Sequence, residues 1–169
     1  MHCSNLDPIS SQTDAFNATA IRSAYMMYLV RQDYRFFVTL TIGGSPAPME
    51  ARRRLGLYSA KVDHAALGRS YQRHPRFRAR YTAVPERLVG HWHYHLGVTP
   101  PQPANPITRS EFEYICWSAW SSICSTGEFH FRAVDNQLEL GRYMTKKLHD
   151  KAVFENIVHS TEFHRNPGN

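Results

Sequence analysis

The chain has 169 residues, and its 20 Lys and Arg against 14 Asp and Glu give a formal net charge of +6 and a pI of about 9.4. A hydrophobic content of 42% excludes a disordered basic tail, because such chains lack the apolar surface that offsets ordering entropy. The longest apolar stretch, residues 24–30, is too short for a membrane span of about 20 residues, and three cysteines without a CxxC pair argue against a disulfide scaffold or a structural zinc site. With no signal-peptide pattern, we expect a cytoplasmic single domain over residues 1–169, flexible at 1–11 and 160–169.

The first half of the chain predicts two helices and two strands. Apolar residues recur at helical spacing over residues 15–31, and the β-branched and aromatic run 34–42 (YRFFVTLTI) predicts a buried strand. Residues 50–69 carry apolar residues among charges and predict a second helix. Residues 77–84 alternate apolar and polar side chains, which is typical of a half-exposed strand, and 85–90 are expected to form a connector.

The second half predicts two more strands and at least two helices. Residues 91–98 read as a strand that pairs with 77–84 in a hairpin, and the four prolines of 99–106 indicate a loop. A helix capped by Thr108 or Ser110 then reaches about residue 124. A short strand over 128–133 precedes a helix that starts at Asp135 or Asn136 and runs to about Asp150, with 152–158 extending it or forming another. This order predicts an α+β fold, a central antiparallel sheet backed by helices.

Positive charge is concentrated between residues 51 and 80, where nine cationic side chains face one acid, Asp63, for a segment charge of +8. These cations are Arg52, Arg53, Arg54, Lys61, Arg69, Arg73, Arg76, Arg78 and Arg80. Arginine matches phosphate oxygens with its planar fork, and the interleaved Tyr71, Phe77 and Tyr81 are suited to stacking on bases. We interpret the eight arginines as nucleic-acid contacts; the alternative is the solvated face of a surface helix.

Three histidines alternate with other residues in the strand predicted over 91–98. Side chains on a strand alternate between its faces, so His91, His93 and His95 are expected to point the same way. Three imidazoles on one face are hard to satisfy with hydrogen bonds in a core, and His residues at i and i+2 on a strand are spaced to bind one divalent ion. We interpret the stripe as a metal site; structural histidines or an exposed stripe without function are the alternatives.

Glu86 is the candidate oxygen ligand for a hard ion at this stripe. It lies seven residues before His93, on the other arm of the predicted hairpin or at its turn. Two His and one carboxylate leave coordination positions open, as a catalytic site requires. From its residue type alone, Glu86 is equally well explained as a solvated turn residue.

Tyr143 and Lys146 fall in the last long predicted helix, where residues three apart share a face. A tyrosine hydroxyl beside a cation can act as a nucleophile, because the positive charge favours the phenolate that develops. Taken alone, YxxK is a weak signal, and Tyr143 is then an ordinary residue at the edge of the core.

Together these features resemble a known family. The strand FVTLTI (residues 37–42), His93-Tyr94-His95 and the C-terminal Tyr143–Lys146, in this order, resemble motifs I, II and III of the HUH endonucleases. The resemblance is closest to single-tyrosine rolling-circle replication initiators of bacterial plasmids, phages and related mobile elements, and it covers roughly residues 34 to 148.

The resemblance implies an RRM-like palm fold and a metal-dependent nickase that cleaves single-stranded or hairpin origin DNA through a 5′-phosphotyrosine intermediate. His93 and His95 would hold Mg²⁺ or Mn²⁺ with Glu86 as the third ligand, Tyr143 would be the nucleophile, and Lys146 would assist it. The chain lacks the GxxxxGK[ST] motif of larger initiators, so a helicase and polymerase of the host are expected partners. His91 lies outside the motif, and Lys147 is an alternative to Lys146.

Three other functions compete with a replication initiator. A transposase of the same superfamily shares the chemistry. A non-catalytic DNA-binding module on the same scaffold would bind without metal or covalent adduct. A small-molecule enzyme built on His91, His93 and His95 would predict a closed β-barrel and leaves the basic segment unexplained.

Overall fold

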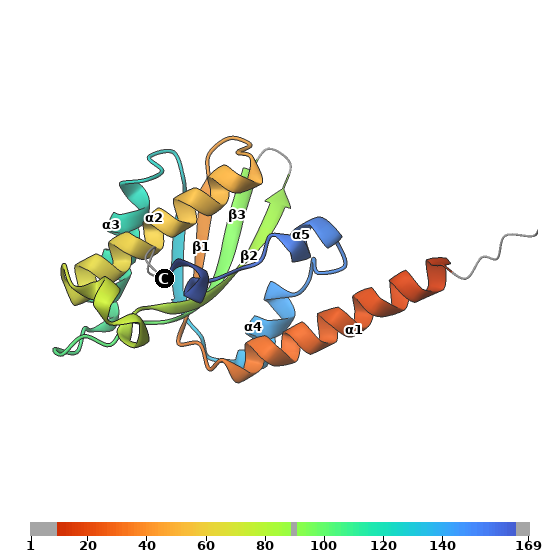
Figure 1. Ribbon diagram of the computed structural model, residues 1–169, viewed down its shortest axis with the longest axis horizontal. Helices are drawn as coiled ribbons and strands as arrows, with labels where there is room; N and C mark the ends of the chain where they lie inside the picture. Colours follow the sequence, from red (N-terminus) through yellow and green to blue (C-terminus); the bar gives the residue numbers. More distant parts are fainter. Residues whose placement is uncertain (1–9, 89–90, 165–169) are drawn as a thin grey trace, which may run out of the picture.

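The computed structural model describes residues 10–88 and 91–164, without the side chains of 10–17, 87, 88 and 91. Its elements are α1 (Ser10–Arg31), β1 (Phe36–Ile42), α2 (Pro48–Leu67), the 3-10 helices η1 (Tyr71–Arg73) and η2 (Pro75–Phe77), β2 (Arg80–Leu88), β3 (His91–Thr99), α3 (Arg109–Ser121), β4 (Phe129–Ala133), α4 (Gln137–Met144), α5 (Lys151–Glu155), β5 (Val158–His159) and the 3-10 helix η3 (Ser160–Phe163). The predicted α+β class, with an antiparallel sheet backed by helices, is confirmed (Figure 1). None of the helices in the described ranges is long and apolar enough to cross a membrane.

The five strands lie in the order β4-β1-β3-β2-β5, and each neighbouring pair is antiparallel. The expected hairpin is formed by β2 and β3, whereas β1 pairs with the other side of β3 from a distant part of the sequence. The histidine-bearing strand β3 is therefore the middle strand of the sheet. Hydrogen-bonded neighbours on both sides fix where its side chains point.

Strand β2 lies further along the chain than the sequence indicates. The predicted strand 77–84 and connector 85–90 are wrong in their bounds, since Phe77 belongs to η2 and β2 runs from Arg80 to Leu88. Pro85 suggested a break, but β5 pairs with β2 only at Thr82 and Ala83. Beyond that point β2 is an edge strand, where a residue without an N–H is tolerated. Glu86 consequently lies within the strand.

The two faces of the sheet have different chemistry. One face, here called the apolar face, packs against α2 and α3; its buried members include Val38, Leu40, Ile42, Ala83, Tyr94 and Leu96. The other, here called the histidine face, carries Phe37 and Thr39 of β1, Glu86 of β2, His93 and His95 of β3, and His130 and Arg132 of β4. The alternation predicted for 91–98 therefore places the imidazoles of His93 and His95 on the face opposite the main core.

Helices α1 and α4 cover one end of the histidine face and build a second, smaller core. Its buried members are Leu29, Tyr34, Phe37, Val84, Leu140, Met144 and Leu148. The two helices approach closely at Gly141, where a Cβ would lie 3.0 Å from Val30 Cγ2 and 3.2 Å from the carbonyl oxygen of Met26. The second core thereby holds α4, and Tyr143 on it, against the sheet.

Helix α4 is shorter than predicted, because it ends at Met144 and not near Asp150. The Thr145 hydroxyl donates to the carbonyl oxygen of Gly141 at 2.8 Å, which competes with continuation of the helix. The carboxylate of Asp150 accepts from the N–H of Ala152 at 2.9 Å and caps the separate helix α5, a role that requires extended backbone at Asp150. Between these points the chain makes tight turns that include Lys146.

The chain ends expected to be flexible are partly described. Residues 1–9 and 165–169 lie outside the described residues, while residues 10 and 11 begin α1. Residues 160–163 form η3, where the carbonyl oxygen of Phe163 accepts from the Arg78 guanidinium at 3.1 Å. The segment 160–163 is thus joined to the body of the protein.

Candidate active site

The strand register brings the predicted metal ligands onto neighbouring strands. Glu86 lies directly opposite His93 in the β2–β3 pair, and Thr39 lies directly opposite His95 in the β1–β3 pair. Opposed residues in an antiparallel pair have Cβ atoms about 5 Å apart. The geometry therefore groups side chains that are up to 56 positions apart in the sequence.

Glu86 is at the centre of a buried polar cluster. Its Oε2 atom accepts a hydrogen bond from His95 Nε2 at 2.8 Å. The same atom forms an ion pair with Lys146 Nζ, also at 2.8 Å. Glu86 and His95 are each only 5% exposed, so these contacts form in a site that is largely shielded from water. Glu86 is therefore not a solvated turn residue, the alternative interpretation of its position.

Burial and charge together set the protonation states of the cluster. Burial lowers the pKa of His95 to about 4 despite the opposing effect of Glu86, so the imidazole is neutral at pH 7. For Glu86, burial raises the pKa, but the hydrogen bonds from Lys146 and His95 and the positive charge of Lys146 lower it by more. The pKa is therefore below its usual value, and the carboxylate stays ionised. For Lys146, partial burial lowers the pKa while Glu86 and Tyr143 raise it more, so the ammonium stays charged.

His95 is held through both ring nitrogens. Because an ionised carboxylate only accepts, the Nε2–H of the neutral ring donates to Glu86. The Nδ1 atom then accepts from the hydroxyl of Thr39 at 3.1 Å. Phe37 stacks on the same ring with centroids 5.5 Å apart. The orientation of this imidazole is thus set by residues of β1 and β2.

Tyr143 stands beside this cluster and remains accessible. Its ring contacts His95 edge to face, with centroids 5.1 Å apart, and Phe37 in the same manner at 5.5 Å. The Lys146 ammonium lies 4.0 Å from the centroid of the Tyr143 ring. At 39% exposure, Tyr143 can be reached by a ligand from solvent. Lys147, the alternative to Lys146, is exposed and forms none of these contacts.

Glu86 and His95 carry an oxygen and a nitrogen donor of the kinds that bind divalent ions, and the two atoms now share a hydrogen bond. Their Nε2 and Oε2 atoms are 2.8 Å apart, near the separation of about 3 Å expected for neighbouring ligands of an octahedral ion with bonds of about 2.1 Å. His93 lies on the same face, its ring centroid 5.7 Å from that of His95. Within the described residues no three His, Cys, Asp or Glu side chains are already placed to hold an ion together. The side chain of His91 lies outside the described residues.

The predicted DNA-binding arginines are divided by the fold. Four of the eight are engaged within the protein: Arg52 pairs with Glu162, Arg53 and Arg54 pair with Glu50, and Arg78 pairs with Asp63. Arg78 is only 5% exposed, so it serves the interior and does not belong to an exposed basic surface. Arg69, Arg73, Arg76 and Arg80 are exposed.

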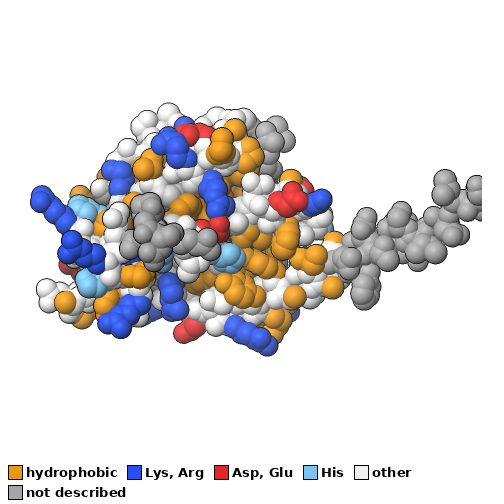
Figure 2. Space-filling model, in the orientation of Figure 1, with side chains coloured by type: hydrophobic (Ala, Val, Ile, Leu, Met, Phe, Trp, Pro, Cys, Tyr) orange, Lys and Arg blue, Asp and Glu red, His pale blue; other side chains and the backbone are white. Residues whose placement is uncertain are grey.

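Most of the basic segment lies on the other side of the sheet from Tyr143. Helix α2 packs on the apolar face, and η1 contacts α2. Figure 2 shows Lys and Arg side chains distributed over the face of the molecule that carries α2. Arg80 is the exception, since it precedes Thr82 and Val84 on the histidine side of β2. The aromatic residues expected to stack on bases are also engaged, Tyr71 under Arg78 and Phe77 under Arg76, while Tyr81 is buried.

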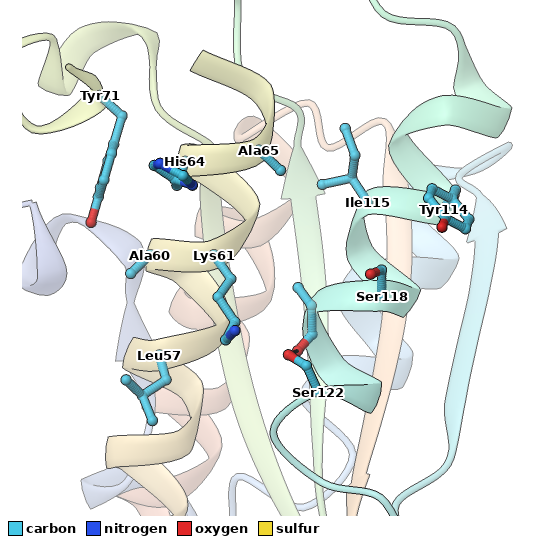
Figure 3. Close-up of a pocket in the computed structure, with 11 residues that line it drawn as sticks. Leu57, Ala60, Lys61, His64, Ala65, Tyr71, Tyr114, Ile115, Ser118 and Ser122 are labelled. Atoms are coloured by element: carbon cyan, nitrogen blue, oxygen red, sulfur yellow. Dashed lines mark hydrogen bonds between the residues drawn. The ribbon is translucent and has the colours of Figure 1, made fainter. Parts of the chain in front are cut away.

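One cleft lies next to the cluster around Glu86 and His95, and a second cavity lies away from it. A cleft of about 270 Å³ adjoins Tyr143 and is lined by Phe37, His130, Phe131 and Arg132. A cavity of about 470 Å³ lies between α2 and α3, with Lys61 and His64 on one wall and Ser118 and Ser122 on the other (Figure 3). The second belongs to the helices of the apolar face and is therefore separate from the candidate site.

Three residues of the site were missed by the sequence analysis: Thr39, Phe37 and Arg132. Phe37 and Thr39 lie in a run that looks uniformly strand-like, and Arg132 occupies a polar position of a short strand. Only the pairing of β1 with β3 and β4 shows that they face His95 and Tyr143. The alternation of polar and apolar residues over 128–133 indicates only that Arg132 lies on the polar face of a strand.

Comparison of the chain with protein-family models, with curated proteins and with solved structures finds no match in any of the three.

Proposed function

We propose that the protein is a metal-dependent single-stranded DNA endonuclease and strand transferase whose nucleophile is the Tyr143 hydroxyl. The observation that carries the proposal is the convergence of Tyr143, Lys146, Glu86 and His95, which come from β2, β3 and the end of α4. The same four residues are the ones to which the resemblance to HUH motifs assigns roles. Their contact in the fold supports a shared chemical role.

The reaction is a transesterification at one DNA phosphate. A lone pair of the Tyr143 oxygen forms a bond to phosphorus, the bond from phosphorus to the 3′ oxygen breaks, and the phenolic proton is balanced by protonation of the leaving 3′ oxygen. The products are a 5′-phosphotyrosyl protein and a free 3′-hydroxyl. Attack by another 3′-hydroxyl reverses the step without ATP, because the phosphoester bond is conserved in the adduct.

Lys146 assists this step through charge. Its ammonium lies against the Tyr143 ring and keeps its proton through its contact with Glu86. A fixed positive charge near the phenol lowers the cost of the negative charge that develops on oxygen during attack. Glu86 thereby positions Lys146 as well as serving as a ligand.

Glu86, His93 and His95 are the residues that would hold Mg²⁺ or Mn²⁺. The bound ion would supply positive charge that polarises the scissile phosphate. His95 is already neutral at pH 7, so its nitrogen does not have to lose a proton to bulk water before it can bind. Stacking on Phe37 and bonding to Thr39 hold the ring in place.

Within this chemistry we favour initiation of rolling-circle replication, in which the freed 3′-hydroxyl primes synthesis. A helicase and a polymerase of the host would then act at the nicked origin. A closed barrel, expected for a small-molecule enzyme built on the histidine stripe, is not formed by the five described strands, whose order leaves β4 and β5 as the two edges.

The test is formation of a covalent protein–DNA adduct. The purified protein is incubated with Mn²⁺ and 5′- or 3′-labelled single-stranded oligonucleotides of random sequence, with and without hairpin arms, and resolved on a denaturing gel. We expect a labelled protein band that retains the 3′ part of the DNA, is absent with EDTA, and is lost in Tyr143→Phe.

Tyr114→Phe is the matched control, because Tyr114 is 65% exposed but lies on α3, across the sheet. It should form the adduct like the wild type. An adduct that persists in Tyr143→Phe, or that forms equally in EDTA, contradicts the proposal. DNA binding without any adduct would instead identify a non-catalytic module.

A further inference from the structure

Arg132 is an exposed arginine on the histidine face, and its surroundings indicate a binding site for an anion. It lies on β4 opposite Phe37, and its guanidinium carbon is 4.7 Å from the centroid of the Phe37 ring. A guanidinium that stacks through its face keeps its in-plane N–H groups available for the oxygens of an anion. The guanidinium of Arg132 therefore lies over a ring while remaining exposed to solvent.

The surroundings of Arg132 differ from those of the paired arginines, and unlike Arg76, which stacks on Phe77, it lies beside Tyr143. Arg52, Arg53, Arg54 and Arg78 each contact a carboxylate. In the described part of the chain, no acid lies within ion-pair distance of Arg132, which is exposed. Its positive charge is thus exposed to solvent and is not neutralised by an ion pair with a described residue.

Arg132 shares a cleft of about 270 Å³ with Tyr143, and the five residues that line it include no acid. Phe37 is one of its lining residues, and the imidazole of His130 on β4, whose side chain is 71% exposed, has its Nε2 atom 3.7 Å from the carboxylate of Glu128, which does not line the cleft. A neighbouring hollow of about 300 Å³ shares Phe37 and Arg132 but also contains Asp135 and Glu139. The cationic and aromatic part is therefore the cleft next to Tyr143.

We propose that this cleft binds the nucleotide adjacent to the scissile phosphate of single-stranded DNA. Arg132 contacts the phosphate of that nucleotide, and His130 stacks on its base. A charged fork combined with a ring is the combination that single-stranded nucleic acid uses. The inference rests on the proposed function and adds a direction to it: the strand passes from the Glu86–His95 cluster across β1 towards β4.

The test measures binding separately from cleavage. Variants are made in the Tyr143→Phe background, in EDTA, and titrated by fluorescence anisotropy with labelled single-stranded DNA of about eight nucleotides. Arg132→Ala should raise the Kd about tenfold and reduce the slope of log Kd against log salt by about 0.7. Arg132→Lys should keep most of the slope but not the affinity, and His130→Ala should weaken binding without changing the slope.

Arg22→Ala is the control, since Arg22 is an exposed arginine on α1 and the change removes the same charge. It should leave the Kd unchanged. Equal effects of Arg132→Ala and Arg22→Ala would overturn the inference, as would RNA of the same sequence binding equally well with the same dependence on Arg132.

The two proposals can fail independently. An adduct on Tyr143 in the wild type, combined with unchanged binding in Arg132→Ala, would overturn the cleft assignment and leave the proposed function standing. The absence of both adduct and single-stranded DNA binding in the wild type would overturn both. Both changes are at exposed side chains, and circular dichroism checks that Arg132→Ala and His130→Ala fold like the parent protein.

Discussion

His95 is the residue on which the contacts of the site converge. Its two nitrogens bond Glu86 and Thr39, its face stacks on Phe37, and its ring meets Tyr143 edge to face. Burial keeps the imidazole neutral. Because one ring mediates all four contacts, a change at any of them alters the position of the ring that the others depend on.

Thr39 is a positioning residue for His95. For the Nε2 atom to bind an ion, its proton must move to Nδ1, and the Thr39 hydroxyl can accept from Nδ1 as readily as it now donates to it. Thr39→Val preserves the shape but cannot accept, and we expect Mn²⁺ affinity to fall about 10- to 100-fold. Titration followed by the EPR signal of free Mn²⁺ measures this, with Thr39→Ser retaining affinity. Equal Mn²⁺ affinity in Thr39→Val and wild type would exclude the role.

Lys146 and Lys147 provide a paired comparison within one turn of chain. Lys146 contacts Glu86 and Tyr143, whereas Lys147 is exposed and contacts neither. Lys146→Met should slow adduct formation roughly a hundredfold, the cost of removing one charge-stabilising group from a reacting centre. Lys147→Met should leave the rate near that of the wild type. Single-turnover rates measured at saturating DNA decide the matter, and similar losses in both variants would assign Lys146 no special part.

For single residues, the sequence identifies those whose residue type is characteristic of catalysis or metal binding. Tyr143, Lys146 and the histidines stand out because their residue types and spacings are those expected of a nucleophile, an assisting cation and metal ligands. Thr39 and Arg132 carry no such signal, because their roles depend on which strand pairs with which. Strand pairing is a long-range property that local spacing does not contain.

Among the elements, β3 determines the geometry of the site through its register. Side chains alternate along a strand, so a shift of one residue would move His95 into the apolar core and Leu96 out of it. The apolar residues on the opposite face, Trp92, Tyr94 and Leu96, are all buried. The free energy of their burial therefore also fixes His93 and His95 on the histidine face.

The ion pair of Asp63 with Arg78 joins α2 to the start of β2. The Asp63 carboxylate accepts from Arg78 Nε at 2.7 Å and from the N–H of Ala79 at 2.8 Å, and both charged side chains are almost fully buried. Asp63→Ala leaves a buried guanidinium unpaired, so we expect the free energy of unfolding to fall by about 3–5 kcal/mol. Urea denaturation measures it.

Glu50→Ala is the comparison for that variant, because it removes an acid from two ion pairs on the surface of the same helix. Pairs in contact with water are screened, and the loss of stability should be much smaller. Similar losses in the two variants would show that burial of the Asp63 pair is not what makes it important.

The elements themselves follow the sequence closely where periodicity is strong, as in β1, α2, β3 and α3. The errors occur where a local signal was outweighed by its neighbours. Pro85 indicates a break but lies at an edge where no N–H is needed, and the helical pattern after Met144 is interrupted by the bonds of Thr145 and Asp150. Both errors affect the site, since they displace Glu86 and Lys146.

For the whole molecule, the sheet separates two groups of cations. Arg132 lies on the histidine face with Tyr143, whereas the exposed arginines of η1, η2 and the turn before them lie beside α2. A short strand bound at Tyr143 cannot reach both groups, because α2 and α3 cover the far side of the sheet (Figure 1). We therefore expect the basic segment to contact DNA that extends beyond the cleavage site.

The triple variant Arg69→Ala, Arg73→Ala and Arg76→Ala tests this division. Binding of DNA about eight nucleotides long should be unaffected, while binding of a strand several times longer should weaken, with a salt slope smaller by up to about 2. Anisotropy titrations at several salt concentrations measure both. A loss of affinity that is the same for short and long DNA would place these arginines at the cleavage site itself.

The central claim, that Tyr143 is the nucleophile, is tested most directly by mapping the adduct. After reaction with single-stranded DNA and Mn²⁺, nuclease and trypsin digestion releases the peptide from Tyr143 to Lys146, because trypsin cleaves after Arg142 and Lys146. Mass spectrometry is predicted to find a nucleotide linked through phosphate to Tyr143 of this peptide. A nucleotide on any other residue, or only unmodified peptide from protein that has cleaved DNA, would contradict it.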